Sequence, residues 1–270
     1  MELTGKVIVI TGAGSGIGRA LALRAHAEGA AHIAVADLNT SAAAETAALI
    51  GPTATAHVCD VSRETDIQAL VTAVETSHGR IDLFCSNAGI LSSDPDFDNA
   101  ASAPNEIWER SWAVHVMAHV YAARAALPGM QARRSGYFLH TVSAAGLLSQ
   151  IGSAVYATTK HAAIGFAESL AIAQKDQGIR VSVLCPQGVA TAMTAGGFFA
   201  GADVDGVMTA EACMDAAIAG LRAETFIILP HPKVAEYMQL KAANYDRWIG
   251  GMAKLRRGVA AARAAFLAKG

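Results

Sequence analysis

Short apolar segments alternate along the chain with longer segments of helical character. The apolar segments are continuous, which is typical of parallel strands buried on both faces of a sheet. Strands are predicted at 6–11, 32–37, 55–59, 81–86, 137–142, 180–185 and 225–229, and helices at 17–28, 41–50, 63–77, 105–127 and 155–177. This order predicts an α/β fold, a doubly wound seven-stranded parallel sheet with helices on both sides.

No repeat, low-complexity linker or compositional break divides the 270 residues. We therefore expect a single domain over residues 1–230, with residues 231–270 as its C-terminal helical extension. Residues 233–256 mix apolar and charged side chains at roughly helical spacing, which predicts an amphipathic helix. Such a helix would either cover the mouth of an active site or pack on a partner subunit.

Two loops differ from this scaffold. Residues 92–104 are polar and rich in turn formers, as an insertion would be. Residues 192–206 are rich in Gly and Ala and contain Phe198 and Phe199. Small residues provide mobility and aromatic rings provide an apolar cover, so this segment is either a lid over an apolar ligand or a surface loop.

Composition favours a globular protein with a large core, since 53% of the residues are hydrophobic and 16% are charged. The net charge of −2 gives no reason to expect nucleic acid as a partner. From residue 231 onward, eight Lys or Arg outnumber Glu236 and Asp246, so this tail carries +6 and the preceding residues −8. A basic tail can contact a membrane or an acidic partner, or it can be a solvated helix face.

The cellular location is predicted from what the sequence lacks. The first residues have no signal-peptide pattern, and no apolar run reaches the roughly 18 residues of a membrane span. The four cysteines have no metal-ligand spacing and are predicted to be reduced: Cys59, Cys85, Cys185 and Cys213. We expect a cytoplasmic protein without a membrane span and without a metal site.

A glycine-rich loop, TGAGSGIG, follows the first predicted strand and opens the first helix. Glycines in this position allow a tight turn and let a pyrophosphate approach the helix amides. The spacing is G-x-x-x-G-x-G. The candidate cofactor-binding residues here are Gly12, Ser15, Gly16, Ile17 and Gly18.

Further polar residues lie at the carboxyl ends of the next strands, where ligands bind in doubly wound sheets. Asp37 can accept hydrogen bonds from an adenosine ribose and would repel a 2′-phosphate, and the nearby cation Arg19 lies one step into the helix. NAD is therefore favoured over NADP, although Asp37 could instead cap the helix that follows. Asp60 and Val61 are expected near the adenine, and Asn87, Ala88 and Gly89 beside the glycine loop.

Tyr156 and Lys160 are four residues apart, which places them on the same face of a helix. The loop T-G-x-x-x-G-x-G, the N-A-G segment, Ser143 and Y-x-x-x-K follow one another in order. With these motifs the chain resembles the short-chain dehydrogenase/reductase family over roughly residues 4–230. The resemblance implies a Rossmann fold and an NAD(P)-dependent oxidoreductase.

The resemblance also implies roles for single residues. Ser143, Tyr156 and Lys160 match the catalytic positions, and Pro186, Val189 and Thr191 match the segment that holds the nicotinamide. An ordinary tyrosine has a pKa of about 10, and we expect Lys160 to lower that of Tyr156. Ser143 would hold the substrate oxygen while Tyr156 exchanges its proton.

His115 stands where the family usually has an asparagine that helps to hold a water linked to the lysine. It is therefore a candidate catalytic residue. Because imidazole both donates and accepts and titrates near neutrality, it could replace the amide in that relay. It could equally be a packed polar residue.

Apolar residues dominate the segments expected to form the substrate pocket. They favour a neutral, fairly hydrophobic secondary alcohol or ketone as substrate. An epimerase or dehydratase, or a cofactor-binding scaffold without activity, are alternatives. The resemblance implies a homodimer or homotetramer joined through the helices at 105–127 and 155–177. The candidate pocket residues are Leu147, Leu148, Gln150, Ile151, Phe198 and Phe199.

Overall fold

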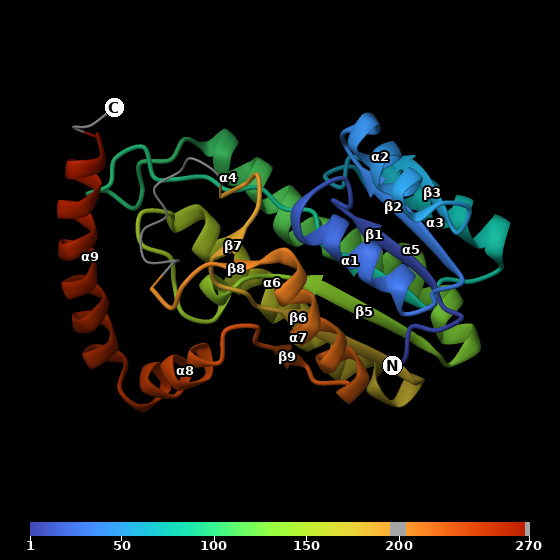
Figure 1. The fold of residues 1–270 in the computed structure, drawn as a ribbon. Coiled ribbons are helices and arrows are strands. Elements are labelled where there is room, and N and C mark those ends of the chain that lie inside the picture. The colour runs from blue at the N-terminus through green and yellow to red at the C-terminus, as the bar shows by residue number, and fades with distance from the viewer. Residues whose placement is uncertain (195–203, 268–270) are drawn as a thin grey trace.

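The computed structural model describes residues 1–194 and 204–267, and its centre is a parallel sheet of seven strands (Figure 1). The strand order is β3-β2-β1-β4-β5-β6-β9, which confirms the doubly wound topology. The order reverses between β1 and β4, where a doubly wound sheet forms its ligand crevice. The strands are β1 (Val7–Thr11), β2 (His32–Asp37), β3 (Ala54–Val58), β4 (Leu83–Ser86), β5 (Gly136–Thr141), β6 (Ile179–Leu184) and β9 (Ile227–Ile228).

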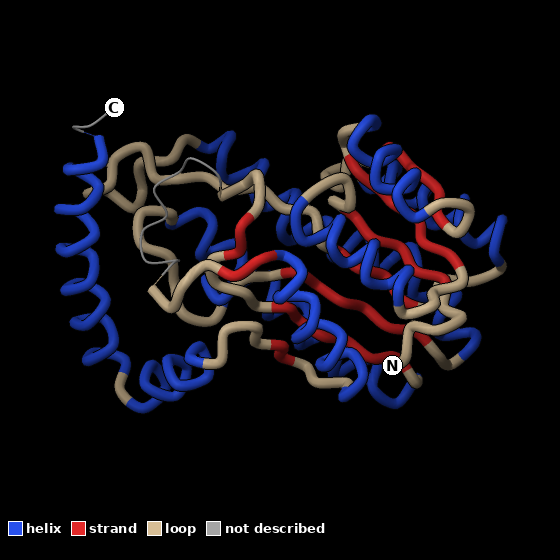
Figure 2. Tube along the Cα trace, viewed as in Figure 1, coloured by secondary structure: helices blue, strands red, loops and turns tan. Residues whose placement is uncertain are grey.

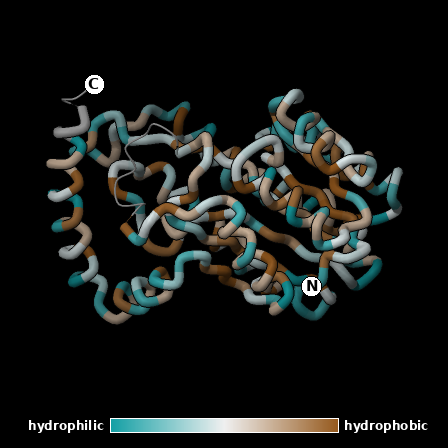
Figure 3. Tube along the Cα trace, in the orientation of Figure 1, coloured by the Kyte–Doolittle hydropathy of each residue, from teal (hydrophilic) through white to brown (hydrophobic). Residues whose placement is uncertain are grey.

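Helices cover both faces of the sheet, as the continuous apolar strands predict (Figure 2). Within β1, Val7 and Val9 belong to one apolar core and Ile8 and Ile10 to the other. The helices of the first face are α3 (Glu64–His78), α5 (Ala118–Arg133) and α6 (Ala154–Gln174); those of the second are α1 (Gly16–Ala27), α2 (Thr40–Ile50) and α7 (Ala210–Ala223). Figure 3 shows hydrophobic residues concentrated along the central strands.

The two outer strands differ from their predictions. In β3 the side chains of Thr55, Ala56 and Val58 are exposed, because β3 is the edge of the sheet and pairs only with β2. The prediction that this strand is buried on both faces is therefore wrong. At the opposite edge β9 contains only two residues.

The helix predicted at 105–127 is longer and contains a wide turn. It consists of α4 (Asn105–Trp112), a π-helical turn η1 (Ala113–Met117) and α5, which continues through Pro128 to Arg133. Proline removes one helical hydrogen bond, yet the helix extends past the predicted end at residue 127. Buried packing of Ala126 and Met130 against the sheet outweighs that loss.

The C-terminal extension forms two helices instead of the single predicted one. α8 (Lys233–Ala243) ends at Asn244, and α9 (Tyr245–Leu267) begins directly afterwards. The Asn244 side chain accepts a hydrogen bond from the backbone N–H of Arg247 at 2.8 Å, so this residue starts a new helix. In Figure 1, α9 stands beside the loops at the carboxyl end of the sheet.

The segment 192–206, predicted as either a lid or a surface loop, lies mostly outside the described residues. On its two sides, β7 (Val189–Ala190) pairs with β8 (Met208–Thr209) in a small parallel ladder that the sequence did not predict. In the described residues, no helix has both the length and the hydropathy needed to span a membrane.

Candidate active site

A cavity of about 1000 Å³ lies at the carboxyl ends of the central strands. The glycine loop borders it at one end, and the segment 148–153 borders it at the other. Tyr156 and Lys160 also line it. The residues predicted separately as cofactor-binding and catalytic thus share one cavity, which is the arrangement that a cofactor-dependent reaction needs.

The glycine loop packs closely against the segment after β4, the strand next to β1 in the sheet. Gly12 has a φ of +65°, and a Cβ there would lie 2.8 Å from the Cα of Ala88. A Cβ on Gly18 would lie 2.1 Å from the carbonyl oxygen of Gly12, so Gly18 serves the packing of the loop on its helix. Ser15, Gly16 and Ile17 line the cavity where α1 begins. This loop can accommodate a dinucleotide pyrophosphate at the amino end of α1.

Asp37 lies at the end of β2 and lines the cavity. Its carboxylate accepts the backbone N–H of Gly14 at 2.8 Å and that of Asn39 at 2.9 Å. The cap of α2 is Asn39, whose side chain accepts from Ala42, so Asp37 does not serve as that cap. Each carboxylate oxygen retains a second lone pair for a ribose hydroxyl.

Arg19, the nearby cation, is held by α2. Its guanidinium donates to Thr46 at 2.9 Å and forms an ion pair with Glu45 at 3.1 Å. This guanidinium is therefore bound by side chains of α2.

The ends of β3 and β4 complete the side of the cavity next to the glycine loop. Asp60 and Val61 line the cavity, and the Asp60 carboxylate is bound by the hydroxyl of Ser62 at 2.7 Å. Ala88 and Gly89 also line it. Asn87 donates to the carbonyl of Thr11 at 3.0 Å, so it fastens the glycine loop to β4.

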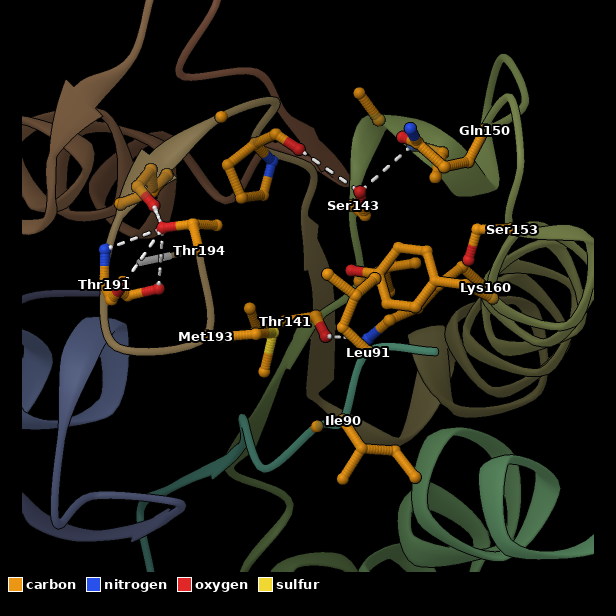
Figure 4. Close-up of a pocket in the computed structure, with 18 of the residues that line it drawn as sticks. Ile90, Leu91, Thr141, Ser143, Gln150, Ser153, Lys160, Thr191, Met193 and Thr194 are labelled. Carbon is orange, nitrogen blue, oxygen red and sulfur yellow. Dashed lines mark hydrogen bonds between the residues drawn. The ribbon is translucent and has the colours of Figure 1, made fainter. Parts of the chain in front are cut away.

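Ser143 and Lys160 face the same cavity from different elements, as Figure 4 shows. Ser143 caps the short 3-10 turn η2 (Ala144–Gly146) that follows β5, and its Oγ accepts the N–H of Ala145 at 3.1 Å. Tyr156 and Lys160 lie on α6, with the Lys160 ammonium 5.5 Å from the centre of the Tyr156 ring. Ser143 lies close enough to the phenol of Tyr156 to act on its pKa. The sequence thus correctly predicted that these three residues meet.

The pKa of the phenol differs from the prediction. Burial raises the pKa of Tyr156, while the neighbouring Ser143 acts in the opposite direction with a smaller effect. Burial also lowers the pKa of Lys160 to about 8, and its ammonium donates to the carbonyl of Thr141 at 3.2 Å. The sequence predicted a lowered pKa for Tyr156, and the pKa is instead raised, because loss of solvent is the largest influence on this phenol.

His115 lies in the π-helical turn and is 1% exposed. Its Nε2 accepts the backbone N–H of Ile90 at 3.1 Å, so the hydrogen of the neutral ring is on Nδ1, which lies 2.9 Å from the hydroxyl of Thr159. Burial and the nearby Lys160 lower the pKa of His115 to about 2. Its ring packs edge-on against Tyr156 at 5.5 Å. The expectation that it titrates near neutrality is wrong, and these contacts favour the packed alternative.

The segment after β6 lies across the cavity from Lys160 (Figure 4). Pro186, Val189 and Thr191 all line the cavity there. The backbone N–H of Thr191 is held by the hydroxyl of Thr194 at 3.0 Å. The carbonyl of Pro186 accepts the N–H of Ala144 at 2.8 Å, so this segment is joined to the loop that carries Ser143.

The candidate substrate residues divide into three groups. Leu148, Gln150 and Ile151 line the cavity. Leu147 is absent from the lining and packs into the apolar core beside Val234, so its predicted role is wrong. Phe198 and Phe199 lie outside the described residues.

Side chains of the C-terminal extension line the cavity. The sequence alone left open whether this extension covers the active site or packs on a partner subunit. Trp248, Met252 and Leu255 line the cavity from α9, and their helical spacing was a signal that one face of α9 is covered. Phe97 lines it from the polar loop, where nothing in the sequence marked it. Of the two predicted alternatives, covering the active-site mouth is the one that these contacts favour.

Cations also border the cavity. Arg110 and Arg263 are part of its lining, and the guanidinium of Arg263 lies 5.2 Å from the ring centre of Phe97. A neutral substrate was expected because apolar residues dominate the segments predicted to form the pocket. That argument therefore no longer holds for the whole cavity.

Comparison with known proteins establishes the family. Residues 6–198 match the family described as short chain dehydrogenase. The chain belongs to the short-chain dehydrogenase/reductase family. A crystal structure of a short-chain dehydrogenase/reductase from Burkholderia phymatum in complex with NAD superposes with a TM-score of 0.81, at 27% identity, over 91% of this chain and 96% of that chain.

Two curated relatives are similar over most of the chain. Epidermal retinol dehydrogenase 2 of Mus musculus is 35% identical over 202 residues, which is 72% of this chain and 64% of that protein. The match thus spans less than two thirds of that relative's length. The 1-deoxy-11-beta-hydroxypentalenate dehydrogenase of Streptomyces exfoliatus is 36% identical over 200 residues, 73% of this chain and 72% of that protein.

Proposed function

We propose that this protein is an NAD(H)-dependent oxidoreductase that interconverts a fairly hydrophobic secondary alcohol and its ketone. The observation that carries the proposal is the meeting of Ser143, Tyr156 and Lys160 in the cavity that the glycine loop also borders. Both curated relatives described above are named dehydrogenases, which supports the same reaction class.

The chain's own residues would hold the substrate and move its proton. Ser143 would hydrogen-bond the substrate oxygen and stabilise its developing negative charge. A bound nicotinamide supplies the hydride acceptor in oxidation and the hydride donor in reduction. Lys160 would donate to the nicotinamide ribose and, below its pKa of about 8, carry a positive charge beside Tyr156.

The raised pKa of Tyr156 bears on the direction of the reaction. Burial keeps the phenol protonated at neutral pH, and the protonated form is the one that donates a proton to a ketone. Alcohol oxidation needs the phenolate to accept the hydroxyl proton. The proposal therefore expects reduction to proceed at neutral pH and oxidation to become faster in alkaline solution.

The preference for NAD rests on charge at the end of β2. Asp37 offers a carboxylate to the adenosine ribose, and Arg19 is engaged by Glu45 and Thr46. In Asp37→Ala, the Michaelis constant for NAD⁺ should rise roughly tenfold, because hydrogen bonds to a charged group of about 1.5 kcal/mol or more are lost. Steady-state kinetics with NAD⁺ and NADP⁺ measure this, and a wild-type enzyme that uses both equally well would contradict the preference.

The apolar side chains that line the cavity indicate the substrate class. Leu148, Ile151, Trp248 and Leu255 line the cavity near Ser143 and from α9. Such a surface favours a bulky alicyclic or aryl group over a short polar one, because each buried CH₂ contributes about 0.8 kcal/mol.

A panel of alcohols tests the proposed function. Oxidation of 2-octanol, cyclohexanol and 1-phenylethanol is followed by the appearance of NADH, at neutral and at alkaline pH. We expect turnover with NAD⁺ on at least one of them. Tight NADH binding without turnover of any alcohol or of the matching ketones would instead favour a cofactor-binding scaffold.

A further inference from the structure

One lysine of the C-terminal extension contacts the two elements that carry the active-site residues. Lys241 on α8 donates from its ammonium to the carbonyls of Leu147 at 2.8 Å and Leu148 at 3.0 Å. A third contact joins it to Nε2 of His161 at 3.3 Å. An ammonium group has three donors, and three acceptors surround this one.

The first two acceptors end the turn that begins at Ser143. The N–H groups of Leu147 and Leu148 both donate to the carbonyl of Ala144, at 3.0 and 2.8 Å. Ser143 stands at the start of this turn and accepts from Ala145. Lys241 therefore fixes the far end of the turn that orients the Ser143 hydroxyl.

The third acceptor belongs to the helix that carries Tyr156. His161 directly follows Lys160 on α6, and its Nδ1 lies 2.8 Å from the carbonyl of Ala157. A carbonyl only accepts, so Nδ1 holds the hydrogen and Nε2 is free to accept from Lys241. One ammonium thus joins the Ser143 turn to the helix of the acid/base pair.

Lys241 is itself held in place by the packing of the extension. Val234 is fully buried and packs with Ala144 and Leu148. The ring of Tyr245 lies 5.4 Å from the ammonium of Lys241. Farther along α9, Arg256 donates to the carbonyl of Phe97 at 2.7 Å, which fastens the extension to a second loop that lines the cavity.

We propose that Lys241 is a positioning residue that sets the place of Ser143 relative to Tyr156 during the proposed alcohol–ketone reaction. The C-terminal extension is then a working part of the active site. The proposal rests on the proposed function, since it needs Ser143 to act on the substrate oxygen.

The test compares Lys241→Met in two backgrounds, with 1-phenylethanol and NAD⁺. In the otherwise wild-type enzyme we expect kcat to fall roughly ten- to a hundredfold, since a small misplacement of a catalytic group has effects of that order. The dissociation constant of NADH should not change. In a Ser143→Ala background the same substitution should cost little more, because its effect acts through Ser143.

Two further variants sharpen the result. Lys254→Met removes an exposed lysine of α9 and should keep wild-type kcat. Lys241→Arg retains the charge and donors and should recover part of the activity lost in Lys241→Met. A Lys241→Met enzyme with the kcat of Lys254→Met, or losses that multiply with those of Ser143→Ala, would overturn the proposal. A wild-type enzyme inactive on the whole panel would defeat the proposed function instead.

Discussion

The residues of the site show how burial, more than neighbouring charge, sets their protonation. Lys160 is 3% exposed, and burial lowers its pKa to about 8, while burial raises that of Tyr156. Spacing in the sequence correctly placed the two side chains together. It could not give the direction of the tyrosine pKa, because desolvation depends on the depth of the cavity that other elements form.

His115 is predicted to support the site structurally. In His115→Ala the N–H of Ile90 and the hydroxyl of Thr159 lose a partner, which should cost about 1–3 kcal/mol in the free energy of unfolding, as measured with urea. Because its pKa is about 2, the shape of the pH–rate profile between about pH 5 and pH 9 should stay as in the wild type. Disappearance of an inflection from that profile would mean that His115 takes part in proton transfer.

At the scale of elements, the length and order of strands and helices were predictable wherever apolar residues mark a buried face. The exceptions are set by contacts distant in sequence. Pro128 stays within α5 because Met130 is buried against the sheet, and Asn244 divides the extension because its side chain caps α9. Phe97 could not be assigned to the cavity, since its place depends on packing against residues distant in sequence, among them Gly152 and Arg256.

The contact between α5 and β5 contains a buried pair of histidines. Nδ1 of His119 lies 3.0 Å from Nδ1 of His140, and burial lowers the pKa of His140 to about 3 and that of His119 well below its ordinary value. The folded protein keeps both rings neutral, whereas the unfolded chain binds protons below about pH 6.5. Stability from this pair is therefore fully present above about pH 6.5 and is lost as the pH falls.

The loss should be measurable by urea unfolding. Between about pH 7 and pH 5 each of these histidines should contribute roughly 2 kcal/mol to the decrease in the free energy of unfolding. His140→Phe, whose ring would lie beside Phe138 and Phe166, should reduce that decrease by the share of one histidine. An equal decrease in wild type and variant would show that other groups cause it.

At the scale of the whole molecule, two long helices expose apolar side chains. Trp112 on α4 is 44% exposed and Ile172 on α6 is 73% exposed. These helices are the ones through which the family resemblance implies association. We expect light scattering at micromolar concentration to give the mass of a dimer or tetramer, and a single species of 27.8 kDa would contradict this.

The C-terminal extension is bonded back onto the rest of the molecule. Its two helices carry most of the positive charge of residues 231–270. Lys241 and Arg256 nevertheless form hydrogen bonds within this chain, to the loops that border the cavity. The sequence indicated amphipathic character in this region. The carbonyl partners of these two cations could not be predicted, because no residue type marks a backbone carbonyl; both cations also bind a side chain, His161 for Lys241 and Asp98 for Arg256.

The proposed function depends most on Tyr156 as the group that exchanges a proton with the substrate. Its most direct test is Tyr156→Phe, which removes one hydroxyl and leaves the ring in contact with His115. The account predicts that turnover of 1-phenylethanol with NAD⁺ falls at least about a hundredfold, the order expected for a general acid–base, while the dissociation constant of NADH is unchanged. A variant that keeps half of the wild-type rate would contradict the assignment.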